Sequence, residues 1–595
     1  MATTSSNSQS NYTIRLKAYN DCDNVHLCWR VLSSNGKDSP LPGCLGFKIE
    51  RQRFKNGRWQ KTEVLRNRVG FENEVVDEND PEQTAKPSSI RPFQRYDWTD
   101  HGANIHETVR YRIAAMAAGQ ADTLGTDELA EISDSGWTDQ IEVNADAGDG
   151  ISVFFNRGTV MSQYVARVAR KNNWSATDIK THISEIEEPL RIFLSGELRN
   201  ALLKILDDTI ANPFYSVYAA LYELSDKELI DKLKLIRSRA NIVLSDGSNS
   251  RKEDGHTVYV DGNADARGKL NRAGVKVFDR MLGAKGLGHN KFLVLVDNRT
   301  DEPLLAWTGS TNWSPTGLCT QLNNGVLIRN PEVASVYYEQ WKKLKAAGSG
   351  FPEALVASNS SSPKTVETMD VWFTRGRKPV PATSLSVDIA ALKQMVDEAE
   401  TSILYVMFQP GLEPLKSILE RGAENDFYIK GVVSTLIASN KEQFALSGGR
   451  PYTTDLKQPE GIGKNFKWWI KEVTRGQFIP YNGRPGIGHA ITHTKMIVID
   501  PFSDNCKVIT GSHNFSKSAS VENDENFIVI RHNRKLAEHY AVACMAMYNH
   551  YRWRAYLKEK SDAGEDIWSH LSDDPKWQSD YLQSKQLIRH LKTWC

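Results

Sequence analysis

The chain has 595 residues, of which 40% are hydrophobic and 25% charged, a composition typical of globular proteins with several domains. The 74 Lys and Arg residues are balanced by 73 Asp and Glu residues, so no global basic field is available to hold nucleic acid. Any anionic ligand therefore requires a local cluster of donors. Seven cysteines without a CxxC pair indicate neither a thiolate zinc motif nor a disulfide framework, although three near the N-terminus leave one small disulfide open.

Targeting and membrane signals are not visible in the sequence. The start lacks a basic segment followed by an apolar core, and no run approaches 18 apolar residues. We expect a soluble protein without a transmembrane segment that reaches lipid only from the aqueous side. A reducing compartment fits the cysteines best, so the protein is expected in the cytoplasm or exported without a classical signal peptide.

The first part of the chain has the pattern of an all-β domain. Residues 1–10 are rich in Ser, Asn and Thr and are expected to be disordered. Residues 11–145 contain short alternating runs between turn signals, which predicts an antiparallel β-sandwich. Trp29 in an early strand and Tyr111 in a late one resemble the core pair of a fibronectin type III domain. Nothing in this segment looks catalytic, and an adaptor or packing module is the simplest interpretation.

From about residue 150 the pattern changes to helices alternating with apolar strands. Residues 226–236 carry apolar residues at helical spacing and precede the strand 240–244, and residues 415–421 precede the strand 427–433. This alternation indicates α/β layering. Residues 553–595, which include Trp568, Trp577 and Trp594, are expected to form a helical extension that docks onto the last domain.

Four short motifs occur twice, in the same order, which indicates two homologous halves at about 150–360 and 365–552. Gly309 follows His289 by 20 residues, and Gly511 follows His493 by 18. The matched pairs are 155–158 (FNRG) with 373–376 (FTRG), 289–291 (HNK) with 493–495 (HTK), 308–314 (TGSTNWS) with 510–516 (TGSHNFS), and Asn324 with Asn526.

The residue types in these motifs suit a phosphodiester. Residues i and i+2 of a strand share a face, so the His and Lys of H-x-K point the same way. A pseudo-twofold pairing of the halves would bring two His, two Lys, two Ser and two Asn into one pocket. Ammonium groups and neutral donors can hold the non-bridging oxygens. The imidazoles can act as the nucleophile and as the group that transfers protons.

The doubled motif resembles that of the phospholipase D superfamily, H-x-K-x4-D followed by G-S-x-N. The second copy, 493–500 (HTKMIVID), matches fully, whereas the first has Val296 at the aspartate position and Asp297 one residue later. The resemblance implies two α/β halves related by pseudo-twofold symmetry, preceded by the sandwich. It implies a metal-independent phosphodiesterase without a cofactor, and a monomer because both copies lie in one chain.

The resemblance also implies roles for individual residues. His289 would be the nucleophile that forms a phosphohistidine, and His493 the general acid. Lys291, Lys495, Asn312 and Asn514 would bind the phosphoryl oxygens, and Ser310 and Ser512 would donate hydroxyl hydrogen bonds to them. Supporting positions are expected at Asp500 and Glu525, which would orient a histidine through its second ring nitrogen, and at Asp297, Asn324 and Asn526.

Other interpretations of nearby residues remain open. His489 and His493 are four apart, like a zinc pair, but the intervening Glu of H-E-x-x-H is absent. His489 also offers a rival register for the second histidine, although only His493 has Lys at +2. Trp468 and Trp469 could enter a lipid interface or stack on bases, but core packing is the simpler explanation. Arg157 and Arg375 could reach a phosphate, although an arginine that ends a strand is usually solvated.

Three functional hypotheses follow. The first is a phospholipase D type enzyme that hydrolyses or transfers phosphodiesters of phospholipids at a membrane surface. The second is a nuclease of the same superfamily, which predicts a basic channel with stacking aromatic residues. The third is a non-catalytic binding protein in which the sandwich is the interaction module. The intact His and Lys in both copies favour the enzymatic hypotheses.

Overall fold

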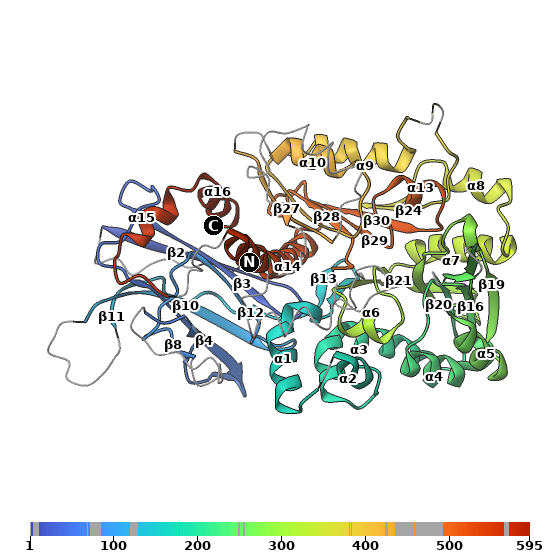
Figure 1. Cartoon of the computed structure of the whole chain (residues 1–595), viewed down its shortest axis with the longest axis horizontal. Helices are drawn as coiled ribbons and strands as arrows, with labels where there is room; N and C mark the ends of the chain where they lie inside the picture. The colour runs from blue at the N-terminus through green and yellow to red at the C-terminus, as the bar shows by residue number, and fades with distance from the viewer. Residues whose placement is uncertain are drawn as a thin grey trace. The chain divides into compact units, whose positions relative to one another are not determined.

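The structure is a computed structural model (Figure 1), and its chain forms two compact units. One unit contains residues 1–145 together with 564–595, and the other contains residues 146–563. The described residues are 2–3, 11–67, 69–71, 85–119, 129–174, 176–247, 250–253, 256–379, 381, 383–422, 426–434, 456–457, 492–563 and 570–595.

The first unit contains two antiparallel sheets, as the alternating runs predict. Trp29 and Tyr111 are both fully buried, and Trp29 meets Phe47 edge-on at 5.5 Å between ring centroids. Residues 1–10 lie outside the described part except for Ala2–Thr3, which pairs with β2 (Tyr12–Asn20). One sheet has the order β1 (Ala2–Thr3), β2 (Tyr12–Asn20), β3 (Val25–Ser33), β9 (Asp97–Asp100), and the other β11 (Ala130–Asp134), β10 (Thr108–Ala117), β4 (Gly46–Lys55), β5 (Arg58–Trp59).

Short strands extend this unit. β6 pairs with β4, β12 pairs with β10, and β7 pairs with β8. No disulfide joins the seven cysteines, all of which are described and buried. The short strands have the bounds β6 (Glu63–Val64), β7 (Arg66–Asn67), β8 (Lys86–Pro87) and β12 (Ile141–Glu142).

The C-terminal segment belongs to the sandwich unit, so the expected docking of this tail onto the second half is wrong for residues 570–595. It forms α15 (Trp577–Leu582) and α16 (Lys585–Trp594). The Tyr19 hydroxyl donates to the Trp594 carbonyl at 2.6 Å, and Gln578 Nε2 donates to the Leu41 carbonyl at 3.0 Å. An amphipathic tail requires an apolar partner, but its sequence does not say which domain supplies it.

The second unit contains two eight-stranded mixed sheets with the same strand order, which confirms the two-half architecture (Figure 1). The first sheet has the order β13 (Asp146–Gly148), β14 (Ile151–Phe155), β22 (Asn324–Ile328), β21 (Glu302–Gly309), β20 (Lys291–Asp297), β15 (Tyr215–Leu221), β16 (Ala240–Ser245), β19 (Lys276–Arg280). The second has the order β23 (Lys364–Val366), β24 (Met369–Phe373), β30 (Asn526–Arg531), β29 (Lys507–Gly511), β28 (Met496–Ile499), β25 (Ser402–Met407), β26 (Tyr428–Val433), β27 (Leu456–Lys457).

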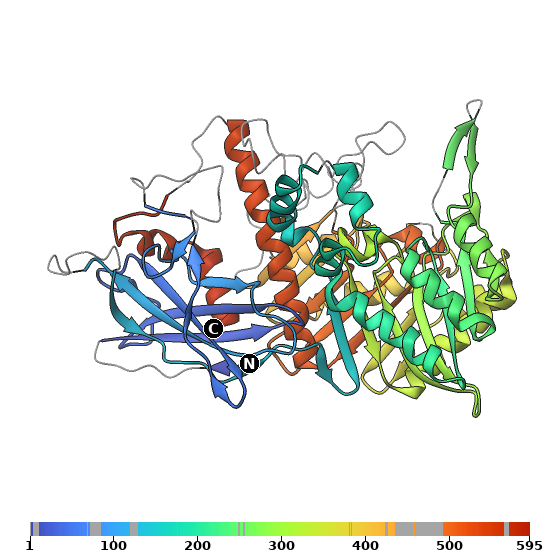
Figure 2. The same cartoon turned by 90° about the horizontal axis from the view of Figure 1, so that it is seen from below.

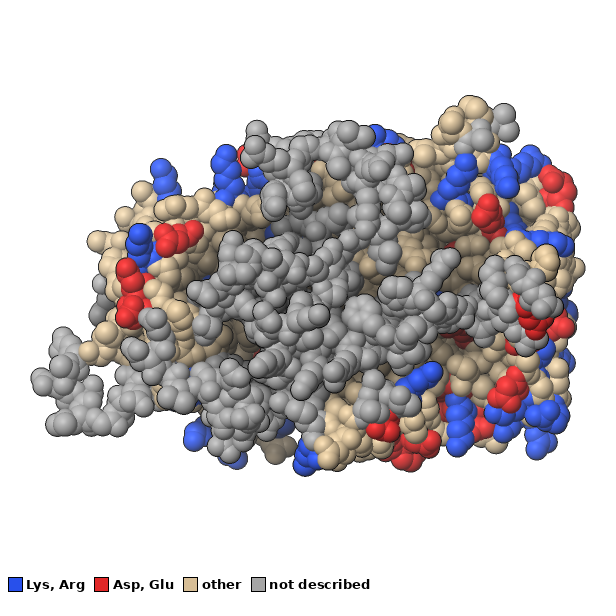
Figure 3. Space-filling model, in the orientation of Figure 1, with Lys and Arg blue, Asp and Glu red and all other residues tan. Residues whose placement is uncertain are grey.

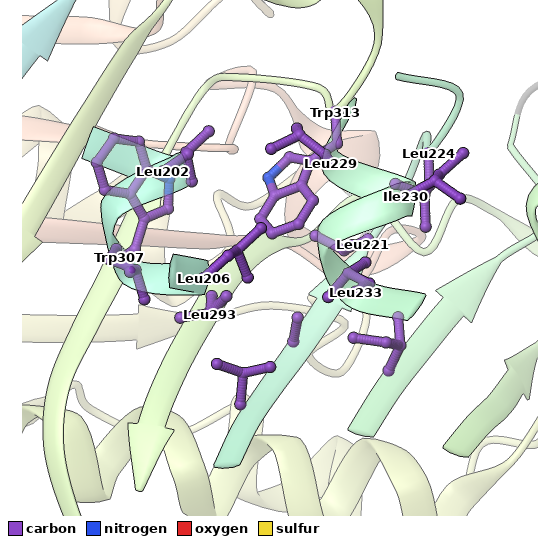
Figure 4. Packing of buried hydrophobic residues seen from close by; sticks show 14 of the residues in the cluster. Leu202, Leu206, Leu221, Leu224, Leu229, Ile230, Leu233, Leu293, Trp307 and Trp313 are labelled. Atoms are coloured by element: carbon purple, nitrogen blue, oxygen red, sulfur yellow. The ribbon is translucent and has the colours of Figure 1, made fainter. Parts of the chain in front are cut away.

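Helices cover these sheets. In the first half, leucines of α3 and α4 pack with Trp307 and Trp313 against the strands (Figure 4). The side chain of Asp226 caps the predicted helix α4 by accepting from Leu229 N at 3.1 Å. The helices of the first half are η1 (Gly158–Met161), α1 (Ser162–Lys171), α2 (Ala176–His182), α3 (Pro189–Ala211), α4 (Lys227–Ile236), η2 (Arg237–Arg239), α5 (Ala264–Arg272), η3 (Gly283–Lys285), α6 (Pro315–Cys319), α7 (Pro331–Ala347) and α8 (Glu353–Asn359).

The second half has α9 (Val387–Asp397), α10 (Leu415–Gly422), α13 (Lys517–Val521) and α14 (Arg534–Ala563). The hairpin of β17 (Ser250–Glu253) and β18 (His256–Tyr259) projects from the first half (Figure 2, green). No described helix is long and apolar enough to cross a membrane.

Candidate active site

The two H-x-K motifs lie at the starts of equivalent strands, β20 and β28. His289 and His493 are 4% and 5% exposed, and both lysines are buried. Lys291 Nζ donates to the His289 carbonyl at 2.8 Å, and Lys495 Nζ donates to the His493 carbonyl at 2.5 Å. The same contact therefore forms in each half.

Each histidine is held by a residue from the other half. His289 Nδ1 lies 2.8 Å from Glu525 Oε2, and His493 Nδ1 lies 2.9 Å from Asn323 Oδ1. Glu525 was expected near a histidine, whereas Asn323 was missed. The repeat could have found it, because Asn323 follows Asn312 by the same 11 residues that separate Glu525 from Asn514. One histidine thus has a charged partner and the other a neutral one.

An aromatic ring covers each histidine and lysine. The Tyr222 ring lies 4.7 Å from the His289 ring, with Lys291 Nζ 4.9 Å from its centroid. In the other half the Phe408 ring lies 4.8 Å from the His493 ring, with Lys495 Nζ at 4.8 Å. Both rings directly follow equivalent strands, β15 and β25, and they shield the ammonium groups from water while offering a π face.

A carboxyl group enters the pocket at Glu223, which sequence reasoning missed. Asn312 Nδ2 donates to Glu223 Oε2 at 2.8 Å. Burial raises the pKa of Glu223, and the Lys291 and Lys495 ammonium groups oppose that rise. Gln409 occupies the equivalent place after β25, so this charge also distinguishes the halves. The Oδ1 atoms of Asn312 and Asn514 have no hydrogen-bond partner among the described residues.

The supporting asparagines join the two halves. Asn324 Nδ2 donates to Thr510 Oγ1 at 2.9 Å, and Thr308 Oγ1 donates to Asn526 Oδ1 at 2.6 Å. Both contacts cross between the sheets at equivalent positions. They place the paired strand ends β21 and β29 side by side, which brings the two motif copies together.

The two serines serve the loops and not the pocket. Ser310 and Ser512 are fully buried, and each accepts from a backbone N–H, that of Asn324 or Asn526, at 3.0 Å. Ser310 Oγ donates to Asn323 Oδ1 at 2.8 Å, so the prediction that it donates to a phosphoryl oxygen is wrong. Ser512 Oγ donates to the Asn526 carbonyl at 3.4 Å. Ser310 thus fixes Asn323, the partner of His493, whereas Ser512 fixes the backbone of Asn526.

The two aspartates of the motif lie at the far ends of their strands. Asp500 accepts from the backbone N–H of Glu400, Thr401 and Ser402 at 2.7–2.9 Å. Asp297 accepts from the backbone N–H and the guanidinium of Arg299. The expectation that Asp500 orients a histidine is therefore wrong, because these contacts stabilise the turn before β25.

Two arginines form ion pairs with the loop that carries Glu525. Asp524 accepts from Arg280 Nε of the first half at 2.7 Å and from Arg375 Nε of the second. Arg375 is buried by this ion pair, so its expected solvation is wrong. Arg157 Nη1 donates to the Phe193 carbonyl at 3.2 Å. His489, Trp468 and Trp469 lie outside the described residues.

The pocket strongly perturbs its titratable groups. Burial lowers the pKa of His289 to about 4 and that of Lys291 to about 7. Burial and the Lys495 ammonium hold the pKa of His493 well below its usual value, and burial does the same to Lys495. Burial alone would raise the pKa of Glu525, but the interaction with His289 lowers it. Such perturbed groups in one place are typical of an active site.

The family model described as "Cardiolipin synthase, PLD-like domain" matches residues 206–345 and 392–547, which contain both motif copies. The fold and the doubled site define a phospholipase D type protein, and the chain belongs to the phospholipase D superfamily. No curated protein matches the sequence significantly.

Several solved structures are similar at low identity. Phosphatidylserine synthase from Haemophilus influenzae Rd KW20 is 10% identical over 66% of this chain and 92% of that one, with a TM-score of 0.39. Nuc, a phospholipase D family member from Salmonella typhimurium, is 20% identical over 32% of this chain and 94% of that one, with a TM-score of 0.17. Polyphosphate kinase from Porphyromonas gingivalis is 11% identical over 56% of this chain and only 45% of that one, with a TM-score of 0.34.

Proposed function

We propose that this protein cleaves phosphodiesters through a covalent phosphohistidine on His289. The observation that supports this assignment is the difference between the two histidine partners. The Glu525 carboxylate accepts the Nδ1 proton of His289, which leaves the lone pair on Nε2 and stabilises the positive charge that builds up when Nε2 attacks. The Asn323 amide is neutral, so it does not stabilise a positive charge on His493 in the way that a carboxylate would.

In the first step His289 Nε2 attacks phosphorus, and the bond from phosphorus to the leaving oxygen breaks. Protonated His493 gives its Nε2 proton to that oxygen. The bound diester supplies the negative charge that favours the imidazolium form of His493, which burial disfavours in the free pocket. Lys291 and Lys495 hold the non-bridging oxygens, with Asn312 and Asn514 as neutral donors.

In the second step neutral His493 takes a proton from water or an alcohol, whose oxygen attacks phosphorus. The phosphorus–nitrogen bond breaks and His289 is regenerated. Water gives hydrolysis and an alcohol gives transfer, so one pocket supports both reactions. Every step uses groups of the chain itself, and no metal ion is required.

We propose phospholipids as the substrate class. A polyanion such as DNA would bring further negative charges toward Glu223, whose carboxyl group interacts with the Lys291 and Lys495 ammonium groups. On the face shown in Figure 3, both basic and acidic side chains appear among the described residues. The description of the matching family, with its lipid synthase, points the same way. A nuclease activity remains the alternative outcome of the test.

The test compares substrates in the presence of a chelator. The purified protein is given phosphatidylcholine vesicles, bis(4-nitrophenyl) phosphate or single-stranded DNA. We expect turnover of the vesicles and of the small diester but not of DNA, and no loss with chelator. Cleavage of DNA alone would overturn the lipid assignment, and metal-dependent turnover of the small diester would overturn the mechanism.

The covalent step has its own test. In His493→Asn the acid is missing, but nitrophenolate leaves without a proton, so phosphorylated protein should accumulate on the small diester. Mass spectrometry after alkaline quench should locate the phosphoryl group on His289. Its location on His493 in the wild type would reverse the assignment of the two histidines.

A further inference from the structure

A second cluster of chemically reactive side chains lies in the sandwich unit. His26 of β3, Asp97 of β9 and His590 of α16 are all buried, and their candidate ligand atoms lie within 4.8 Å of one another. His590 Nε2 lies 4.0 Å from Asp97 Oδ2. These residues are far apart in sequence, so the cluster exists only because α16 belongs to the sandwich unit.

His26 has one ring nitrogen that is bonded and one that is not. Its Nδ1 lies 2.9 Å from Thr99 Oγ1, while Nε2 is buried without a hydrogen-bond partner among the described residues. A buried polar atom without a partner has lost its hydrogen bonds to water and gained none in return, so its position requires an explanation. Histidine ligands of metals have this arrangement, with the second nitrogen fixed by an oxygen atom.

The surroundings add donors of the same kind. Cys28 shares the face of β3 with His26, and its thiol lies within hydrogen-bond reach of Cys595 and close to Asp97. Arg95 Nη2 contacts both oxygens of Asp97, at 3.1 and 3.2 Å, and so fixes the carboxylate. Two imidazoles, a carboxylate and nearby sulfur are the ligands that Zn²⁺ prefers.

We propose that His26, Asp97 and His590 bind a zinc ion that fastens residues 585–595 to the sandwich. Zinc–ligand bonds of about 2.0–2.2 Å place tetrahedral ligand atoms roughly 3.4 Å apart, so the side chains must approach by about 1 Å. The ion would be structural and would belong to a different unit from the phosphodiester pocket.

The test is metal binding by the full chain. The protein is treated with a chelator and dialysed, and Zn²⁺ or Co²⁺ is then added. Bound metal is measured by inductively coupled plasma mass spectrometry. We expect about one equivalent per chain, a visible Co²⁺ spectrum of tetrahedral type, and a rise in the unfolding temperature with Zn²⁺. His26→Ala and His590→Ala should lose the equivalent and the rise.

Two control variants locate the site. His101→Ala removes an exposed histidine of the same unit, and His289→Ala removes one from the phosphodiester pocket; both should keep the full equivalent. Wild-type protein that binds no metal, or an octahedral Co²⁺ spectrum, would overturn the proposal without reliance on any variant. Retention of the metal by His590→Ala would overturn it as well.

Discussion

The two imidazoles of the pocket differ in what accepts their Nδ1 protons, a carboxylate for His289 and an amide for His493. The rest of their surroundings is nearly symmetric, with a lysine and an aromatic ring on each side. Besides Glu223, which has Gln409 as its counterpart, the Glu525 carboxylate is the main difference between the two sides, and the proposed division of work between the histidines rests on it. This division can be tested with substitutions that keep the hydrogen bond.

Glu525→Gln should lower kcat by about 10–100-fold with a smaller change in KM, because the amide still orients His289 but no longer stabilises its positive charge. Steady-state kinetics on bis(4-nitrophenyl) phosphate measures the effect. Glu522→Gln is the matched control, since it removes an exposed carboxylate from the same loop. Equal effects of the two substitutions would refute the role of Glu525.

Glu223→Gln should lower KM for a monoanionic diester. A carboxylate beside the bound phosphate repels it, so we expect KM to fall by up to about tenfold. The glutamine oxygen can still accept from Asn312. Gln409→Glu places a charge at the equivalent position of the other half and should raise KM; a higher KM in Glu223→Gln would contradict the argument.

The pH profile of kcat/KM on bis(4-nitrophenyl) phosphate, whose leaving group needs no proton from His493, should be bell-shaped. His289 must be unprotonated, so activity falls as the pH drops through about 4, and Lys291 must be protonated, so activity falls as the pH rises through about 7. Lys291→Arg should shift the upper limb to higher pH, because arginine stays protonated. A profile that is flat up to pH 9 in the wild type would exclude this role for Lys291.

At the scale of elements, each motif combines a chemical part with a structural part. The start of β28 presents His493 and Lys495, whereas its far end holds Asp500, which accepts three backbone N–H bonds and one from the Thr401 hydroxyl at 2.7 Å. The same strand thus presents the reactive groups and fastens the neighbouring strand β25. In the first half, Asp297 serves only its own turn.

Asp500→Asn should therefore destabilise the protein and spare the chemistry. Loss of hydrogen bonds to a buried carboxylate costs about 2–4 kcal/mol, whereas Asp297→Asn, whose partner Arg299 is exposed, should cost less than about 1 kcal/mol. Urea unfolding measures both. Below the unfolding transition, kcat of Asp500→Asn should stay within a few-fold of wild type. A loss of kcat as large as that caused by His493→Ala would show that Asp500 takes part in the reaction.

These elements also show what the sequence can predict. H-x-K and G-S-x-N specify their own geometry, because strand periodicity and a tight turn fix neighbouring side chains. Glu223 lies 66 residues before His289 and enters the pocket only through the alignment of β15 beside β20, which no local pattern reveals. The motif gives the sequence distance between Asp500 and His493. It does not show that the strand between them carries Asp500 to the opposite end, away from the histidines, so the predicted contact with a histidine is wrong.

At the scale of the whole molecule, the described residues of the candidate active site all lie within residues 146–563. This unit should therefore turn over a small soluble diester within about tenfold of the full chain. Removal of residues 1–145 alone should give a less soluble protein, since Leu591 and Trp594 would lose the sandwich that buries them. Size-exclusion chromatography and turnover of bis(4-nitrophenyl) phosphate check both expectations.

Turnover of phospholipid vesicles distinguishes a sandwich unit that docks on a membrane from one that only stabilises the chain. If the sandwich unit brings the enzyme to a membrane, its removal should reduce turnover of vesicles much more than turnover of the small diester. Equal losses on both substrates would show that the sandwich only stabilises the chain.

The return of residues 570–595 to the sandwich has a consequence for protein synthesis. A ribosome makes the strands of the sandwich first, but the helix that closes their core leaves the exit tunnel only after both catalytic halves. The catalytic unit can therefore fold during translation, whereas the first unit made is the last one completed. A nascent chain carries an open sandwich while residues 146–563 are made, and that interval is when it depends most on chaperones.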